Sequence, residues 1–460
     1  MARFAVQRLV VVLCLAVLGS GLALADNQPR PTESSDTQAA QIPLVERIKI
    51  ATAIHDAVTT YFAHWQAIPN EDFDADFDRY IEAITQTGQR RDFDMATLAL
   101  FAHLHNGHTG FSDAWLNQHS GHRPGLSVAH RNGHWIVVRS SRPGIAPGQI
   151  ITAIDDTPID AFYADKKRYI AASSERQRSR QMFARAYLFP RRFTLHLANG
   201  DSQTIDRSKP GEQAIKKAET DSQINWPAGV YYHRIPSFEQ PDEQAQAIAF
   251  IKKHHDAKVL VLDVRGNGGG ITPNKLVNAL LLKPYLGMGE ASAMSVGLLS
   301  AYGKLAGSPM LKDYPRMDAM ADAMHEYFDR PMLYWPGHLH KPDHPIYRGR
   351  LIVLADMGCA SSCEDLLIPL KESHRAKIIG DTTYGSTGQP FIQQFDNGMG
   401  FRVGAKREFF GDGRPFEGGG VKPDVAVVPT AADLRAGHDP VLARARTLAA
   451  EPQTAAARKH

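Results

Sequence analysis

The sequence predicts a multidomain α/β protein, and its composition and its hydrophobic patterns both support this. Of its 460 residues 43% are hydrophobic and 22% charged, which is an ordinary globular composition. At roughly 150 residues per domain this length allows about three domains. Along the chain a helical hydrophobic pattern is followed by strand-like runs, and then by apolar strands that alternate with helices. The last pattern is typical of a sheet covered by helices on both faces.

Changes in this pattern and in local composition divide the chain into segments. The polar segments contain proline or many charged residues and are expected to be linkers. The predicted segments are a signal peptide (1–25), a disordered linker (26–42), an N-terminal helical domain (43–120), a β-rich domain (121–207), a linker (208–228), an α/β core (229–435) with an insertion (286–347), and a C-terminal helix and tail (436–460).

The first 25 residues have the layout of a secretory signal peptide. Arg3 and Arg8 precede an apolar run over residues 9–18, and Ala23-Leu24-Ala25 forms a small-x-small cleavage site. Cleavage there removes two arginines and no acidic residue, which lowers the formal net charge from +3 to +1. We therefore expect an exported protein, periplasmic or released into the medium, with no stable membrane insertion. The nearly balanced charge does not indicate a nucleic-acid partner.

The secondary-structure pattern changes twice along the chain. Apolar residues at three- and four-residue spacings predict helices around 45–54, 73–81 and 98–104. Alternating patterns then predict strands at 134–139, 149–154 and 192–197, with a helix at 160–172. In the α/β core we expect strands at 231–235, 258–264, 351–355, 377–380, 391–395 and 401–409, and helices at 242–254, 274–282 and 365–373. The aromatic insertion at 286–347 either lines a cleft or simply packs over one edge of the sheet.

Two turns that follow predicted buried strands contain candidate functional groups. The segment Asp263–Gly270 (DVRGNGGG) is either a tight turn without a ligand or a backbone that binds an oxyanion. Ser361 lies between a strand and a helix, where free N–H groups and the helix dipole favour a developing negative charge. Ser361 and Glu364 also match a capping box, which would explain both residues structurally.

His108 and Glu417 each lie in a glycine-rich loop. The loop His105–Gly110 (HNGHTG) is expected to leave the His108 ring reachable. Glu417 precedes three glycines and is either a solvated loop residue or a carboxylate that orients a histidine. His103, His105 and His108 lack both a His-x3-His spacing and a nearby acidic ligand, so no metal site and no cofactor are predicted.

In this order the motifs resemble the C-terminal processing (tail-specific) serine peptidase family over almost the whole chain after residue 25. Residues 263–270 are similar to its glycine-rich signature, and residues 360–364 with 375–385 are similar to its nucleophile segment. Residues 146–156 resemble a strand of its PDZ-like domain. The resemblance implies an N-terminal helical bundle, a PDZ-like β-rich domain, and an α/β peptidase core of the crotonase/ClpP-like type.

Ser386 separates two branches of that family. In the bacterial tail-specific branch a lysine at this position is the general base, so the chain is instead similar to the branch of the tricorn-protease core and the interphotoreceptor retinoid-binding protein. The tricorn core uses a Ser-His-Glu arrangement, and the matching positions here are Ser361, His108 and Glu417. The resemblance implies that these are the nucleophile, the general base and the group that orients the imidazole.

The oxyanion hole implied by the resemblance consists of the backbone N–H of Ser362 and that of one residue of 268–270, with Gly269 preferred. The implied activity is that of an exported serine endopeptidase that cleaves unfolded or C-terminal polypeptide segments. The PDZ-like domain would capture substrate by strand addition, although residues 121–128 show no clear carboxylate-binding loop. Two alternatives stay open: a catalytically degenerate scaffold that binds an apolar ligand or a peptide, and a hydrolase of non-peptide esters or amides.

Cys359 and Cys363 are the only cysteines after residue 25, and they flank Ser361. In an oxidising periplasm they could form a local disulfide. From the sequence we favour the other possibility, two buried free thiols.

Overall fold

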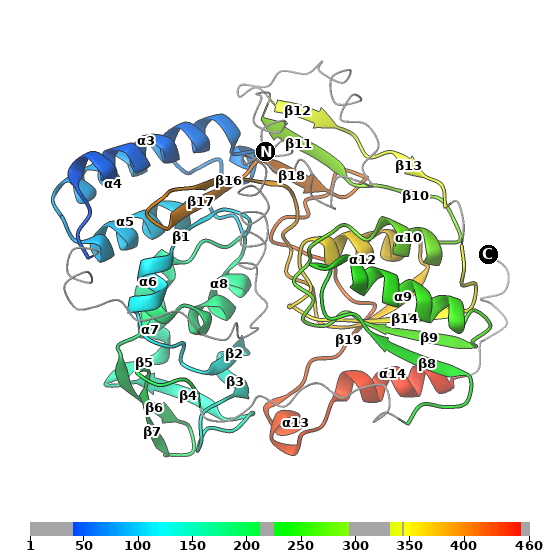
Figure 1. Ribbon diagram of the computed structural model, residues 1–460. Coiled ribbons are helices and arrows are strands. Elements are labelled where there is room, and N and C mark those ends of the chain that lie inside the picture. The colour runs from blue at the N-terminus through cyan, green and yellow to red at the C-terminus, as the bar shows by residue number, and fades with distance from the viewer. Residues whose placement is uncertain (1–39, 212–224, 294–331, 343–344, 452–460) are drawn as a thin grey trace, which may run out of the picture.

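The computed structural model of the protein describes residues 40–211, 225–293, 332–342 and 345–451 (Figure 1). The predicted signal peptide, most of both predicted linkers and the centre of the insertion lie outside the described residues. Within the described ranges, no helix is both long and apolar enough to cross a membrane.

The three predicted N-terminal helices are present. They are α3 (Leu44–Tyr61), α4 (Phe73–Thr85) and α5 (Arg90–Ala102). The Asp72 carboxylate caps α4 by accepting the N–H of Ala75 at 3.0 Å. The predicted disorder of segment 26–42 is wrong for its last residues, because the Ala40 carbonyl accepts the N–H of Arg90 at 2.8 Å.

The β-rich unit is an antiparallel sheet in the order β2-β3-β4-β6-β7, with β5 paired to β4. The predicted helix at 160–172 is shorter than expected and continues as a 3-10 turn, and a further short helix, α8, was not predicted. The elements are β2 (Leu126–Arg131), β3 (His134–Ser140), β4 (Ile150–Ile154), β5 (Thr157–Pro158), α7 (Ile159–Lys166), α8 (Glu175–Gln181), β6 (Arg192–Leu197) and β7 (Ser202–Asp206). One hydrophobic core runs through this sheet and the N-terminal helices, so the two units are packed together.

The α/β part contains a five-stranded sheet, β19-β15-β14-β9-β8, in which every pairing is parallel. Along β9, Leu260 and Leu262 pack in one hydrophobic cluster with α10 and α12, while Val259 and Val261 pack in another with α14. Helices therefore cover both faces, as predicted (Figure 1). The elements are β8 (Val230–Arg234), α9 (Pro241–Lys253), β9 (Val259–Asp263), α10 (Asn274–Leu280), β14 (Arg350–Ala355), α12 (Ser362–Glu372), β15 (Ala376–Gly380), β19 (Val425–Ala426), α13 (Ala431–Ala436) and α14 (Pro440–Ala450).

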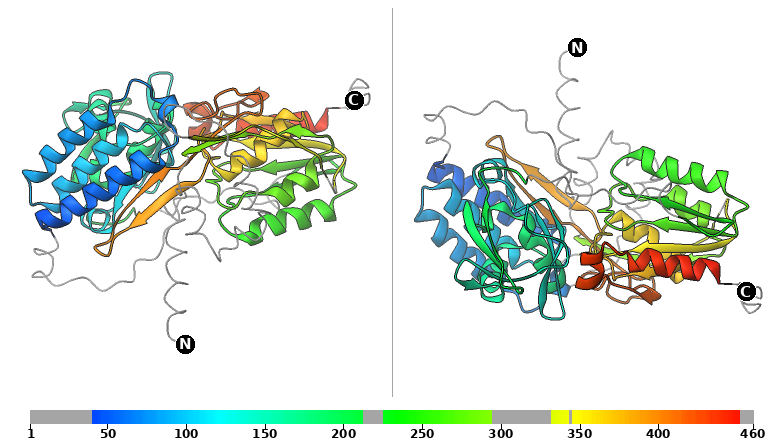
Figure 2. Two further views of the ribbon diagram at one scale, coloured as in Figure 1. Left: turned by 90° about the horizontal axis from the view of Figure 1, so that it is seen from above. Right: turned by 90° about the horizontal axis from the view of Figure 1, so that it is seen from below.

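Two antiparallel structures connect the halves of the molecule. The hairpin of β16 (Pro390–Gln394) and β17 (Met399–Gly404) leaves the α/β part and pairs through β17 with β1 (Gly110–Asp113). Figure 2 shows this hairpin, in orange, reaching the N-terminal helices. The predicted strand at 401–409 is therefore two strands, because β18 (Lys406–Phe409) turns away and pairs with β11 (Gly289–Ala293).

The ends of the predicted insertion form short strands. β11 pairs with β12 (Met332–Trp335), and β10 (Tyr285–Leu286) pairs with β13 (Leu339–His340). The pairing of β1 with β17 matters for the site, because the loop that carries His108 leads directly into β1.

Candidate active site

Three loops meet at the carboxyl edge of the parallel sheet. The glycine-rich loop 264–270 follows β9, the turn at Ser361 follows β14, and loop 381–386 follows β15. These strands are neighbours in the sheet, so their carboxyl ends lie side by side. In open parallel sheets this edge is where ligands bind.

Ser361 forms the turn between β14 and α12 in a strained backbone conformation. Its φ is 54° and its ψ is −127°, a region that costs a residue other than glycine about 1–3 kcal/mol. The residue is only half-buried, and it stands directly before the first turn of α12. The helix begins at Ser362, three residues earlier than predicted, which brings its free N–H groups to the candidate nucleophile.

The Glu364 carboxylate holds this turn against loop 381–386. As the capping-box pattern predicts, it accepts the N–H of Ser361, at 3.2 Å. It also accepts the N–H groups of Gly385 at 2.7 Å and Ser386 at 3.0 Å, and the hydroxyl of Thr383. Burial raises the pKa of Glu364, while the hydrogen bonds that it accepts from loop 381–386 stabilise the ionised form and act in the opposite direction. The structural role of Glu364 and a catalytic role of Ser361 are therefore compatible.

His108 directs its Nδ1 atom at the hydroxyl of Ser386, at 2.5 Å. Its loop is held by Asn106, whose Oδ1 accepts the His108 N–H at 3.0 Å. The expectation of a reachable ring is wrong, because the residue is only 3% exposed. Burial lowers the pKa of His108 to about 3, and the cation of Arg402 acts in the same direction. Nε2 is buried and has no hydrogen-bond partner among the residues that the structure describes.

Glu417 lies in the loop between β18 and β19 and reaches the same hydroxyl as His108. Its Oε1 accepts three hydrogen bonds, from Ser386 Oγ at 2.7 Å, Ser173 Oγ at 2.5 Å and Asn106 Nδ2 at 3.0 Å. Its Oε2 is buried without a partner in the described part of the chain. Burial raises the pKa of Glu417 to about 7. A solvated loop carboxylate is therefore not what the structure contains.

The structure brings the three predicted residues to one neighbourhood but does not join them directly. His108 and Glu417 both bond the Ser386 hydroxyl, and the N–H of Ser361 donates to the Ser386 carbonyl at 3.0 Å. Since His108 Nε2 has no partner within the described ranges, it makes no hydrogen bond to Ser361. Ser386 thus links all three.

The two predicted oxyanion donors flank Ser361. A Cβ atom on Gly269 would lie 2.6 Å from Ser361 Cβ and 3.0 Å from the Ser362 nitrogen. The Gly269 N–H, however, already donates to Asn267 Oδ1 at 2.9 Å, whereas the Ser362 N–H makes no hydrogen bond within the described chain. Ser362 is therefore the better donor, and Gly269 leaves the room that Ser361 needs.

Cys359 and Cys363 form a disulfide with a Cα–Cα distance of 5.4 Å. The preference for two free thiols is therefore wrong. Both residues are fully buried beneath the turn that carries Ser361. The turn from strand to helix brings the two Cα atoms to a separation typical of disulfides.

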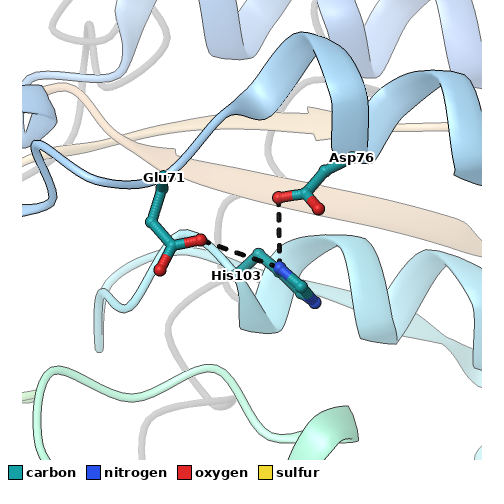
Figure 3. A group of neighbouring side chains, drawn as sticks. All are labelled: Glu71, Asp76 and His103. Atoms are coloured by element: carbon teal, nitrogen blue, oxygen red, sulfur yellow. Dashed lines mark ion pairs between the residues drawn. The ribbon is translucent and has the colours of Figure 1, made fainter.

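The histidines before His108 take part in ion pairs. His103 Nδ1 lies 3.1 Å from Asp76 Oδ2 and 3.8 Å from Glu71 Oε2 (Figure 3). His105 Nε2 lies 3.0 Å from Glu71 Oε1, so the expectation that no acidic ligand lies near these histidines is wrong for both His103 and His105. This cluster could geometrically surround a cation, but Asp76 also pairs with Arg79, and the His103 side chain is 48% exposed. We interpret it as a surface ion-pair network.

Sequence reasoning missed three residues of the site and recognised a fourth, Ser386, only as a departure from a family pattern. Asn106 is fully buried beside His108. Ser173 comes from the β-rich unit, directly before α8, and Gln177 of that helix donates to the Tyr384 carbonyl. The pair Ser173-Ser174 before a charged run is a helix-start signal, and it indicates nothing about Glu417.

Known proteins share this fold. Residues 229–427 match Peptidase family S41. Mature CPAF superposes with a TM-score of 0.63 at 14% sequence identity, over 87% of this chain and 96% of CPAF. CPAF complexed with lactacystin gives a TM-score of 0.60 at 15% identity, over 87% and 97% of the two chains. The photosystem II D1 C-terminal processing protease is 17% identical over 83% of this chain and 93% of its own, with a TM-score of 0.46. No curated protein matches the chain in sequence.

The disulfide predicts the outcome of a thiol titration. In the denatured, unreduced protein lacking residues 1–25, we expect no reactive thiol, because Cys359 and Cys363 are bonded to each other. After reduction two thiols per chain should react. Two reactive thiols before reduction would contradict the disulfide.

Replacing Glu364 should destabilise the protein far more than replacing a glutamate elsewhere on α12. Glu364→Gln turns an amide donor toward N–H groups that need an acceptor, so we expect a loss of about 2–4 kcal/mol in the free energy of unfolding. The control is Glu372→Gln on the same helix, which removes only an exposed ion pair with Arg414 and should cost less than about 1 kcal/mol. Chemical denaturation followed by circular dichroism measures both, and equal losses would exclude the scaffolding role of Glu364.

Proposed function

Because the chain belongs to peptidase family S41 and is a serine-type peptidase, we propose that it is an exported endopeptidase with a Ser361-His108-Glu417 triad. Its proposed substrates are unfolded or C-terminal polypeptide segments. The observation that carries this proposal is that all three residues converge on Ser386, through its carbonyl in the case of Ser361 and through its hydroxyl in the case of the other two.

In the proposed reaction Ser361 Oγ attacks the carbonyl carbon of the scissile peptide bond. Its proton passes to Nε2 of His108, which then delivers it to the leaving amine. Water hydrolyses the resulting acyl-enzyme by the same route in reverse. Burial keeps the His108 imidazole neutral at pH 7, so one ring nitrogen carries a lone pair that can accept a proton. A pKa of about 3 makes the free imidazole a weak base, so the proposed proton transfer depends on stabilisation of the imidazolium by the Glu417 carboxylate.

The negative charge of the tetrahedral intermediate would form at the N-terminus of α12. The unused N–H of Ser362 and the positive end of the helix dipole are available there. The hydroxyl of Ser362 donates to the Gly270 carbonyl at 2.6 Å, which ties this helix end to the glycine-rich loop. The second donor would come from that loop, where the N–H groups of Gly268 and Gly270 make no hydrogen bond within the described residues.

Substrate capture is proposed for the β-rich unit, as the resemblance to a PDZ-like domain implies. The supporting observation is that β2 is an edge strand of its sheet, and edge strands offer unpaired backbone groups to an extended peptide. The proposed location is the periplasm, with release into the medium as the alternative. The signal-peptide pattern of residues 1–25 and the disulfide beside Ser361 both favour an oxidising compartment.

One observation favours the second candidate, a binding protein on a degenerate peptidase scaffold. His108 Nε2 makes no hydrogen bond to Ser361 in this structure. Catalytic hydrogen bonds, however, are often long or absent without substrate and tighten when it binds. The labelling experiment below separates the two candidates.

Ser361→Ala and His108→Ala should each abolish cleavage of a denatured protein substrate. Loss of a nucleophile or general base lowers kcat by about 10⁴- to 10⁶-fold in serine peptidases. A fluorophosphonate should label the wild-type protein at Ser361, label His108→Ala slowly, and leave Ser361→Ala unlabelled. Thermal unfolding verifies that both variants fold. Unlabelled wild-type protein, or full activity in either variant, would favour the binding scaffold.

Gly269→Ala should slow catalysis by displacing Ser361. The added methyl group would lie 2.6 Å from Ser361 Cβ and 2.7 Å from the Ala360 carbonyl oxygen. A shift of about 1 Å in a reacting group can cost about 10²-fold in rate, so we expect kcat to fall by roughly that factor.

The matched control is Gly200→Ala. Gly200 has a φ of 90°, close to the 96° of Gly269, but a Cβ atom there would meet nothing within 4 Å. Both variants therefore carry similar backbone strain, and only Gly269→Ala collides with the proposed nucleophile. Similar kcat values for the two variants would contradict the placement of Ser361.

A further inference from the structure

The Ser386 hydroxyl stands between the imidazole and the carboxylate of the proposed triad. Its Oγ is 2.5 Å from His108 Nδ1 and 2.7 Å from Glu417 Oε1. In the described part of the chain no hydrogen bond joins His108 to Glu417 directly. We infer that Ser386 is a positioning residue: its hydroxyl bonds both Glu417 and His108 and so couples the carboxylate to the imidazole. This inference rests on the proposed function of the same site.

The direction of each hydrogen bond follows from the number of protons. A hydroxyl has one proton to donate, and an ionised carboxylate can only accept. Ser386 therefore gives its proton to Glu417 and accepts the proton on His108 Nδ1. This arrangement fixes the proton of the neutral imidazole on Nδ1 and leaves the lone pair on Nε2, the atom that must take the proton of Ser361. The buried, unpartnered state of Nε2 agrees with this assignment.

The backbone of Ser386 is fixed independently of its hydroxyl. Its N–H donates to Glu364 Oε2 at 3.0 Å, and its carbonyl accepts the N–H of Ser361 at 3.0 Å. The residue is fully buried. Removal of the hydroxyl should therefore leave the turn and the nucleophile in place, so that a variant tests the coupling and not the fold.

The space around the hydroxyl explains why a small side chain stands here. A Cβ atom on Gly107 would lie only 3.0 Å from Ser386 Oγ, so the loop that carries His108 packs directly on it. A lysine, which the tail-specific branch has at this position, would have to displace that loop. In this chain the position therefore holds a serine, whose hydroxyl bonds a different proposed base, His108.

A second hydroxyl provides a matched control. Ser173 Oγ also donates to Glu417 Oε1, at 2.5 Å. Unlike Ser386, it makes no hydrogen bond to the His108 imidazole among the described residues. Ser173→Ala and Ser386→Ala each remove one donor from the same carboxylate oxygen. Only Ser386→Ala breaks the connection to the imidazole.

The kinetic experiment compares Ser386→Ala, Ser386→Thr and Ser173→Ala on one peptide substrate. Loss of the imidazole's orientation should lower kcat of Ser386→Ala by about 10²- to 10⁴-fold and leave KM nearly unchanged. Threonine retains a hydroxyl that can bond both His108 and Glu417, so the kcat of Ser386→Thr should lie within about tenfold of the wild-type value. The kcat of Ser173→Ala should fall less than that of Ser386→Ala, because the bond between Ser386 and the imidazole remains.

The pH profile separates coupling from a structural effect. Activity should rise with pH as Glu417 ionises, because only the carboxylate form stabilises the imidazolium. The other titratable or charged groups that act on this pair are Arg402, His64 and Lys406 near His108, and Arg407, Glu364 and Tyr384 near Glu417. Ser173→Ala removes a hydrogen bond that lowers the pKa of Glu417, so its acid limb should shift to higher pH. In Ser386→Ala the remaining activity should no longer depend on the ionisation of Glu417.

A measurement without substrate distinguishes failure of this inference from failure of the proposed function. Nitrogen-15 NMR of histidine-labelled protein, with His108 assigned by comparison with His108→Gln, should show the Nδ1–H tautomer in the wild type. In Ser386→Ala we expect a mixture of tautomers. If the wild type is inactive but shows the Nδ1–H tautomer, the proposed peptidase function fails while the coupling role of Ser386 stands. A Ser386→Ala variant with the wild-type tautomer and kcat would overturn the coupling role.

Discussion

The buried carboxylate of Glu364 connects the ends of two neighbouring strands, and the geometry of the site depends on it. It accepts four hydrogen bonds, one from the turn of Ser361 and three from residues 383–386. A carboxylate has about four acceptor positions, so none is left over. Because β14 and β15 are parallel neighbours, their following loops already lie close together. Through these hydrogen bonds Glu364 fixes the position of Ser361, the proposed nucleophile, relative to Ser386.

The same site depends on parts of the chain that are far apart in sequence. His108 arrives on the loop that leads into β1, which pairs with the hairpin strand β17. Ser173 arrives from the β-rich unit and bonds the Glu417 carboxylate, while Gln177 of α8 holds the loop before Ser386. Each of these contacts crosses between two units of the fold. A displacement of the β-rich unit would therefore remove hydrogen bonds from the proposed catalytic groups themselves.

The sequence predicted features that depend on local periodicity and missed those that depend on tertiary contacts. The alternation of strands and helices predicted the sheet covered by helices and the turn that contains Ser361, because both follow from the hydrophobic period and the location of turns. The helix α8 (ERQRSRQ) was missed because it has no apolar face: Gln177 and Ser179 are its buried residues. The hydroxyl of Ser386 has no local signal either, since its partners lie 278 and 31 residues away. A spacing of four residues is compatible with either two free thiols or a disulfide. The backbone of the turn places the two Cα atoms 5.4 Å apart, which allows the disulfide, and the spacing alone does not reveal this distance.

The hydroxyl between carboxylate and imidazole also has an energetic consequence. A carboxylate in direct contact with His108 would stabilise the imidazolium and raise the pKa of the histidine. With Ser386 in between, burial dominates, and the pKa of His108 falls to about 3 while that of Glu417 rises to about 7. The imidazole is thus neutral in the resting enzyme and free to accept a proton. In the proposed reaction, transfer of the Ser361 proton to His108 creates an imidazolium near the Glu417 carboxylate in a buried site, so the attraction between the two charges would develop during the reaction. An interaction that is stronger in the transition state than in the resting state accelerates the chemical step.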